Sequence, residues 1–293
     1  MLERNKIYPN EDYGHSNHNL FLVCNSNLAL YRRISTVNST KMEKISKVNA
    51  TKLEKMSKAN DSPAIYMSRE EARNSRVYKY LNRPVFREIT KISDEDHLDL
   101  FLHLETWEAP QHFQGVLTYK FAKYDSQNRP VWILTFGTYP AKDIIDSGDE
   151  VQLEHYVWQC AHWIAKSIVA KTPEENPSQQ AVVIFNGKGA SAANFLNART
   201  LGFLFKMTRK SAKSTLYLLG LGVGVNVNKV GVFVLNLLRP VLGATLKKVE
   251  LFGKDESTWR PRLEEVFEGD EIPSFKGMGR GFYRIVQKSP SGE

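Results

Sequence analysis

The chain has 293 residues, of which 42% are hydrophobic and 25% charged. This is ordinary globular composition, and it excludes collagen, a coiled coil and a wholly disordered chain. The 40 basic residues outnumber the 32 acidic ones and give a net charge of +8, which favours an anionic partner such as nucleic acid or an acidic membrane surface. Two cysteines, Cys24 and Cys160, are too few for a four-cysteine zinc site or a disulfide framework, and they indicate a reducing compartment.

The sequence predicts neither a secretory signal nor a membrane span. The first residues, Met1-Leu-Glu-Arg-Asn-Lys, lack the apolar stretch and the small-residue cleavage site of a signal peptide. The most apolar region, residues 216–242, is interrupted by polar residues, namely Asn226, Asn228, Lys229, Asn236 and Arg239. We therefore expect a cytoplasmic protein whose membrane contact is peripheral.

Residues 1–62 form a basic, low-complexity leader that contains an eleven-residue repeat. Residues 40–49 return as residues 51–60, and the apolar members of the repeat are Met42, Ile45, Leu53 and Met56. Eleven residues make three helical turns, so these side chains would form one narrow stripe. Two interpretations stand: a basic amphipathic helix lying on anionic lipid, or a solvated and partly disordered leader.

Residues 63–110 predict a small helical region. Ser68 and Glu71 have capping-box spacing at the start of a helix that should end before Pro84. A second helix should run over residues 93–106. Its apolar side chains recur at helical spacing: Leu98, Phe101 and Leu102.

From residue 111 to residue 288 strands alternate with helices. Strands are predicted over residues 116–122, 131–136, 181–185, 214–219 and 248–252. Helices are predicted over residues 149–171, 190–213, 230–238 and 259–267. Residues 125–130 read as a turn, because Asp and Asn bond their own backbone there. This alternation predicts an α/β domain with a mixed or largely parallel sheet.

The chain carries no convincing catalytic, nucleotide-binding or metal-binding motif. The run Gly220-Leu-Gly-Val-Gly has Val225 where a dinucleotide loop needs its third glycine. His155 and His162 lie seven residues apart on one predicted helix face, a spacing more typical of packing than of catalysis. We therefore expect a protein that is not an enzyme and needs no cofactor or metal.

Residues 176–249 contain no Asp or Glu, although they carry ten Lys and Arg residues. Very apolar segments lie between these cations, above all residues 230–242. Nucleic-acid binders usually interleave cations with exposed aromatic residues, so nucleic acid is not the expected partner. Aliphatic surface flanked by cations is typical of a membrane interface. The alternative is that residues 230–242 are an ordinary core helix.

Several short motifs, in the right order, resemble those of the CRAL-TRIO lipid-binding family. Asp125-Ser-Gln-Asn-Arg-Pro-Val resembles the family's D-x-x-G-R-P-V turn, and residues 181–189 resemble its D-x-K-G strand end. Residues 235–242 are similar to the gate helix and the K-P-F-L that follows it. Residues 272–279 are similar to the closing L-P-x-x-F-G-G. Over residues 85–285 the ordered set identifies a divergent member.

The resemblance implies a sheet flanked by helices around an apolar cavity, closed by a mobile gate helix that touches the membrane. The family glutamate is absent near Tyr217, so the resemblance does not extend to phosphoinositide handling. The residues expected to line the cavity and gate, with core packing as the alternative for most of the cavity wall, are Trp132, Leu134, Phe136, Tyr156, Trp163, Phe185, Phe233, Leu237, Leu238 and Leu242. Those expected to meet lipid phosphate, or else to form a solvated basic face, are Lys229, Arg239, Lys247 and Lys248.

We therefore expect non-catalytic binding of a hydrophobic ligand, phospholipid or another small lipid, and its transfer between anionic membranes. The alternative is an interaction scaffold of the same fold on anionic membranes, with a filled cavity and no ligand exchange. A nucleic-acid binder has only the net charge in its favour.

Overall fold

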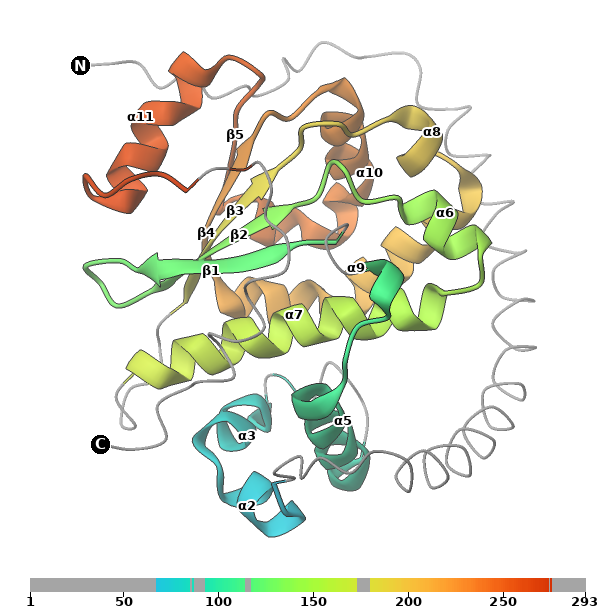
Figure 1. Cartoon of the computed structure of the whole chain (residues 1–293), viewed down its shortest axis with the longest axis vertical. Helices are drawn as coiled ribbons and strands as arrows, with labels where there is room; N and C mark the ends of the chain where they lie inside the picture. Colours follow the sequence, from blue (N-terminus) through green and yellow to red (C-terminus); the bar gives the residue numbers. More distant parts are fainter. Residues whose placement is uncertain are drawn as a thin grey trace. The chain divides into compact units, whose positions relative to one another are not determined.

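The computed structural model describes residues 67–84, 86, 93–113, 117–172, 180–273 and 275, so the leader and its repeat lie outside the described residues. Five strands form one sheet, in chain order from edge to edge (Figure 1). They are β1 (Tyr119–Tyr124), β2 (Pro130–Thr135), β3 (Ala181–Asn186), β4 (Leu219–Val225) and β5 (Val249–Leu251). β1 is antiparallel to β2, and β2 to β5 are parallel. The predicted mixed α/β sheet is confirmed.

Side-chain hydrogen bonds of Asp125 build the turn between β1 and β2. Its carboxylate accepts from the backbone N–H of Gln127 at 3.0 Å and of Arg129 at 2.8 Å, and from Nε of Arg129 at 2.7 Å. Asn128 has a φ of 58°, a left-handed conformation that Asn adopts more readily than most residues. The turn that the sequence predicts over residues 125–130 is confirmed.

The helices that connect the parallel strands lie on one face of the sheet. α6 (Ala141–Asp146) and α7 (Glu150–Lys171) join β2 to β3, and α8 (Ala192–Phe195) and α9 (Ala198–Leu218) join β3 to β4. α10 (Lys229–Leu246) joins β4 to β5. Because such crossovers are right-handed, α7, α9 and α10 share one side, which we call the inner face. α11 (Glu256–Phe267) packs on the opposite, outer face (Figure 1).

The outer face is closely packed. Alternate side chains of β2, β3 and β4 point towards α11 and are 0% exposed: Val131, Ile133, Val182, Ile184, Val223 and Val225. The side chains of α11 that cover them are Trp259, Leu263, Val266 and Phe267. Burying one side chain of this size stabilises the fold by about 1.5–3 kcal/mol. The outer face therefore forms a filled core.

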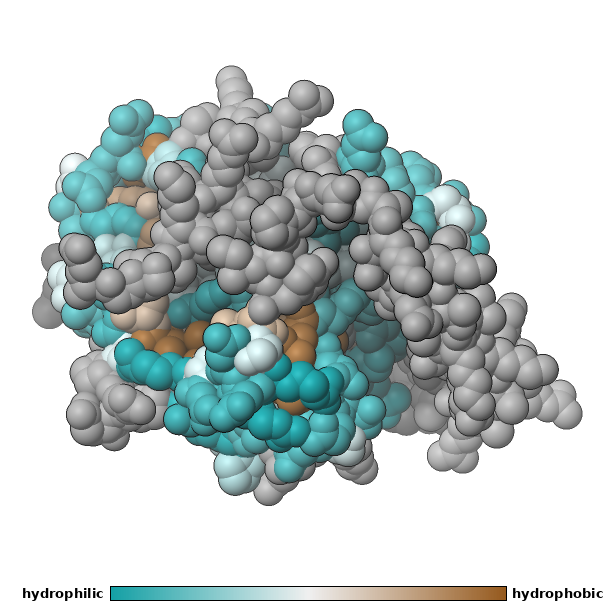
Figure 2. All heavy atoms as spheres, turned by 60° about the horizontal axis from the view of Figure 1, so that its bottom comes forward, coloured by the Kyte–Doolittle hydropathy of each residue, from teal (hydrophilic) through white to brown (hydrophobic). Residues whose placement is uncertain are grey.

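The helical region that precedes the sheet packs on α7. It consists of α2 (Arg69–Asn74), α3 (Arg76–Leu81) and α5 (Asp94–Thr106), and a 3-10 turn, η1 (Gln111–Phe113), follows. Tyr80 of α3 is buried against Trp163 and Ile164 of α7. Figure 2 brings this side forward and shows hydrophilic residues towards the viewer, with apolar residues recessed behind them.

The helix predicted between Ser68 and Pro84 is two short helices. The capping box of Ser68 and Glu71 is confirmed, since the Ser68 side chain accepts from the Glu71 N–H and the Glu71 side chain from the Ser68 N–H. Ser75 then adopts an extended conformation, with ψ at 142°, and its hydroxyl caps α3 by accepting from the N–H of Tyr78. A competing cap thus divides the predicted helix.

Two further predictions along the chain are corrected. The strand predicted over residues 214–219 is wrong, because residues 214–218 continue α9 and the strand begins at Leu219. A short apolar run suits either a helix or a strand, so its pattern alone is ambiguous. The helix predicted over residues 230–238 extends to Leu246, although Pro240 inside it has no N–H to donate.

Helix α10 is the one helix among the described residues that is long and apolar enough, by length and composition alone, to cross a membrane. Only 17% of its residues are buried. The sequence predicts no segment long and apolar enough to span a membrane, and this prediction is corrected. The helix continues past residue 242, and its only charged residues are Lys229 and Arg239. Its inward side chains pack on neighbouring helices, so we describe it as a surface helix of this domain.

Candidate functional site

Two rows of side chains cross the inner face of the sheet, and we call these ten residues the floor. Strand register places in the first row Tyr119, Leu134, Phe185, Gly224 and Leu251. It places in the second row Phe121, Trp132, Val183, Gly222 and Val249. The polar side-chain groups in the two rows are the Tyr119 hydroxyl, which donates to Oε1 of Gln159 at 3.1 Å, and the Trp132 indole N–H, which donates to Oγ of Ser167 at 2.9 Å. The floor is therefore an uncharged, apolar surface.

The floor is less buried than the outer face of the same strands. Trp132 is 0% exposed and packs on Trp163 and other residues of α7. Leu134, Val183 and Phe185 are only half-buried, although they belong to the central strands β2 and β3. A side chain in the middle of a sheet stays accessible only where the covering helices do not close on it. The floor therefore retains accessible apolar surface next to Trp132.

Glycines of β4 leave room for the ring of Phe185. A Cβ atom at Gly224 would lie 2.5 Å from Cε2 of Phe185 and 2.8 Å from Cδ2 of Leu251. A Cβ atom at Gly222 would lie 3.0 Å from Cγ2 of Val249. The Phe185 ring therefore occupies the space of a missing side chain. Sequence reasoning named Phe185 as a wall residue and missed Gly222 and Gly224, although glycine at every second position of residues 220–224 marks a strand face without side chains.

Helix α10 is anchored at its start and along one side. The Asn228 side chain accepts from the N–H of Gly231 at 3.1 Å and donates to the carbonyl of Ala190 at 2.7 Å. Val234 and Leu238, each 6% exposed, pack in a cluster with Phe195 of α8. The partly buried Leu242 packs against the same cluster. Leu237 is half-buried and lies one helical turn after Phe233, on the same side of the helix as Phe233 and outside this cluster.

The opposite side of α10 is apolar and exposed, with a cation at each end. Phe233 exposes 48% of its surface, and Pro240 and two small residues of the last turns are also exposed. Lys229 begins the helix and Lys247 follows it, both exposed. Arg239 is exposed between them and donates to Oδ1 of Asn236 at 3.0 Å. This side combines hydrocarbon with groups that attract phosphate.

Lys248 differs from the other three predicted cations. Its Nζ donates to the carbonyl oxygens of Leu216 and Leu219, both at 2.8 Å. Burial lowers the pKa of its ammonium group. The two carbonyls stand at the C-terminal end of α9, where the helix dipole favours a cation. Lys248 therefore ties this end of α9 to the start of β5, and its ammonium group is already bonded to the two carbonyls.

The remaining residues predicted to line the cavity lie in three different environments. Tyr156 and Trp163 are 5% and 6% exposed, and the Tyr156 ring centroid lies 5.0 Å from that of Tyr119 on the floor. Phe136 follows β2, exposes 37% of its surface and stacks on Phe195 with 5.1 Å between ring centroids. Leu134 and Phe185 are the predicted wall residues that meet on the accessible part of the floor.

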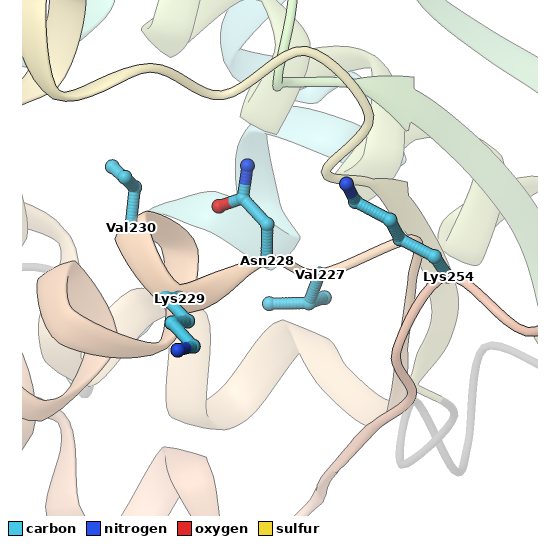
Figure 3. A pocket seen from close by; sticks show the side chains of 5 residues that line it. All are labelled: Val227, Asn228, Lys229, Val230 and Lys254. Atoms are coloured by element: carbon cyan, nitrogen blue, oxygen red, sulfur yellow. The ribbon is translucent and has the colours of Figure 1, made fainter.

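A surface depression of about 550 Å³ lies at the start of α10 (Figure 3). The residues that line it are Val227, Asn228, Lys229, Val230 and Lys254. Figure 3 shows the side chains of Asn228 and Lys254 pointing the same way and Lys229 pointing the other way. The depression is wide open to solvent, so it does not enclose a hydrocarbon chain.

Comparison with known proteins identifies the family. The model of the CRAL/TRIO domain matches residues 115–279, more than half of the chain, and this match includes the whole sheet. The chain therefore belongs to the CRAL/TRIO family, whose members bind and transfer hydrophobic lipids. The chain is also similar to a solved structure described as the crystal structure of Sfh5, with 14% sequence identity and a TM-score of 0.46. The alignment covers 73% of this chain and 80% of the Sfh5 chain. No curated protein matches the chain.

Proposed function

We propose that this protein binds a hydrophobic ligand, phospholipid or another small lipid, against the floor and transfers it between membranes without catalysis. The observation that supports this proposal is the half-burial of Leu134, Val183 and Phe185 on central strands. Since the floor carries no charge, the part of the ligand that lies on it is hydrocarbon. Shielding hydrocarbon from water stabilises the complex by about 25 cal/mol per Å².

Helix α10 serves in this proposal as the gate that contacts the membrane. Its exposed side, with Phe233, exchanges water for acyl chains at the bilayer surface. Lys229, Arg239 and Lys247 form no ion pair with a carboxylate of the described chain, so they remain available for lipid phosphate. A cation near an anionic leaflet contributes about 1 kcal/mol to binding. We place this action at the cytoplasmic surface of anionic membranes, with peripheral association.

The gate is tested by transfer of fluorescent phosphatidylcholine from donor to acceptor vesicles that contain anionic lipid. Phe233→Asp together with Leu237→Asp puts two charges on the apolar side of α10 and should abolish transfer while the melting temperature stays near that of the wild type. Val151→Asp is the matched control, because it puts a charge on a residue that is 46% exposed on α7 rather than on α10. This variant should transfer lipid at the wild-type rate. Normal transfer by the double variant would contradict the gate assignment.

A second candidate function is a scaffold on anionic membranes that exchanges no ligand. It is favoured by the packing of Val234 and Leu238 on Phe195, which fills the space on the inward side of the first half of α10. Native mass spectrometry of the purified chain separates the two functions. A transfer protein should carry co-purified lipid, whereas a scaffold should have the mass of the chain alone.

A further inference from the structure

The interface between α5 and α7 contains two facing histidines with unsatisfied nitrogens. The ring centroids of His103 on α5 and His155 on α7 lie 4.8 Å apart, with the planes at 67°. Nε2 of His103 and Nδ1 of His155 are buried and have no hydrogen-bond partner within the described chain. Trp107 packs edge-on against His155, with 5.8 Å between ring centroids. A buried polar atom without a partner is costly, so this pair calls for a physical account.

The polar groups next to this pair are satisfied. The side-chain amide of Gln159 donates to the carbonyls of Leu104 at 3.3 Å and Trp107 at 2.6 Å. Glu105 of α5 lies 2.9 Å from Nε2 of His162 and 2.7 Å from Nζ of Lys166, both on α7. A positive charge on His162 would thus meet a carboxylate, whereas one on His103 or His155 would meet the other imidazole.

We propose that the His103–His155 pair is an acid-sensitive contact, which holds α5 on α7 while both rings are neutral and releases it when they become protonated. Protonation gives each ring a second N–H donor, and the interface offers no acceptor for it. Two imidazolium rings at this separation also repel each other.

The surrounding charges do not offset this repulsion. Burial lowers the pKa of His103, and the charge of His155 lowers it further. Burial also lowers the pKa of His155, which the neighbouring Glu154 raises only in part. Glu154 is itself paired with Lys206 and Lys210 of α9. Close to the pair, Glu105 binds His162 and Lys166, and His112 binds Asp149. The remaining charged or titratable residues are Asp94, Glu95, Asp96, His97 and Asp99 on α5, and Glu150 and Lys171 on α7.

The sign of the pH dependence follows from these lowered pKa values. The docked form binds fewer protons than the undocked form, so docking weakens as the pH falls through about 6.5, the ordinary value for histidine. A histidine that stays neutral when docked weakens docking by up to about tenfold between pH 7.5 and pH 5.5. Two such histidines weaken it by up to about a hundredfold.

The contact has a consequence for the floor, and this step alone rests on the proposed function. Trp163 of α7 packs on Trp132 of the floor, so the helix that α5 holds is also the helix that covers the sheet. An anionic leaflet at about −30 mV lowers the pH at its surface by about half a unit. Release of α5 would therefore be favoured at the membrane where the lipid is exchanged.

Hydrogen exchange of the full chain, read by mass spectrometry, tests the contact. After correction for intrinsic rates, protection of residues 94–106 should fall from pH 7.5 to pH 5.5, by up to about a hundredfold if both histidines stay neutral when docked. Protection of residues 256–267 in the outer core should not change. His103→Leu with His155→Phe should abolish the acid response. His112→Gln is the control and should behave as the wild type, because His112 is exposed and paired with Asp149.

Equal protection of α5 at both pH values in the wild type would overturn the proposal, as would an acid response that survives in the double variant. If the double variant does not fold, the histidine ring resonances of the wild type decide instead. Two histidine rings should have a pKa below about 6.5. A spectrum in which no ring does would also overturn the proposal. These measurements involve no lipid, so a failed transfer assay leaves their outcome intact.

Discussion

Gly224→Val tests whether the Phe185 ring borders the ligand. The new Cβ would lie 2.5 Å from Cε2 of Phe185 and 2.8 Å from Cδ2 of Leu251, so both side chains must move. Leu251 lies on an edge strand, and Phe185 is half-buried, so the ring has accessible space into which it can turn. That space is the accessible part of the floor. We therefore expect the displaced ring to occupy the place of the ligand.

The magnitude follows from two opposing effects. Overpacking of this kind costs about 1–3 kcal/mol, whereas replacing glycine by a β-branched residue in a strand returns about 0.5–1 kcal/mol. The net loss in the free energy of unfolding should be at most about 2.5 kcal/mol, which leaves the protein folded. Lipid that co-purifies with the chain should fall several-fold, as measured by organic extraction and mass analysis.

Two variants separate ligand displacement from general damage. Gly224→Val with Phe185→Ala removes the clash with the ring and keeps the one with Leu251, so its loss of stability should be smaller than the sum of the two single losses, as measured by urea unfolding. Gly243→Ala on α10 is the matched glycine control, because a Cβ there meets no atom within 4 Å. Gly224→Val that retains its lipid while losing stability would refute the placement of the ligand against Phe185.

Two further predictions concern stability. Leu263→Ala truncates a side chain that is 0% exposed in the outer core, so urea unfolding should show a loss of about 2–5 kcal/mol, and a loss below 1 kcal/mol would contradict the filled core. Burial would raise the pKa of Glu105, but His162 and Lys166 outweigh it and hold the value at about 2. Its folded pKa is thus depressed, so its stabilisation is present above about pH 4.5 and is lost as the pH falls towards 2. Glu105→Gln should flatten this part of the stability profile, and an unchanged profile would count against the ion pair.

Local interactions explain which parts of this structure the sequence predicts. The turn at Asp125 and the capping box of Ser68 and Glu71 use hydrogen bonds between residues at most four positions apart. The apolar strands β2 and β3 and the family motifs are also continuous in the chain, so they could be recognised directly. At the end of α9, by contrast, the pattern of residues 214–219 fits a strand and a helix equally, and the boundary was missed.

The sequence by itself thus determined the α/β class, the family and the apolar character of residues 230–242. Only the tertiary structure decided which face of the sheet is the floor, because β2 and β3 are apolar on both faces and either could have received α11. It also decided that Trp132 is core while Leu134, two residues away, is accessible. The His103–His155 contact joins residues on different helices, so no local pattern could reveal it. These outcomes depend on how helices pack across the sheet, which involves residues far apart in the chain.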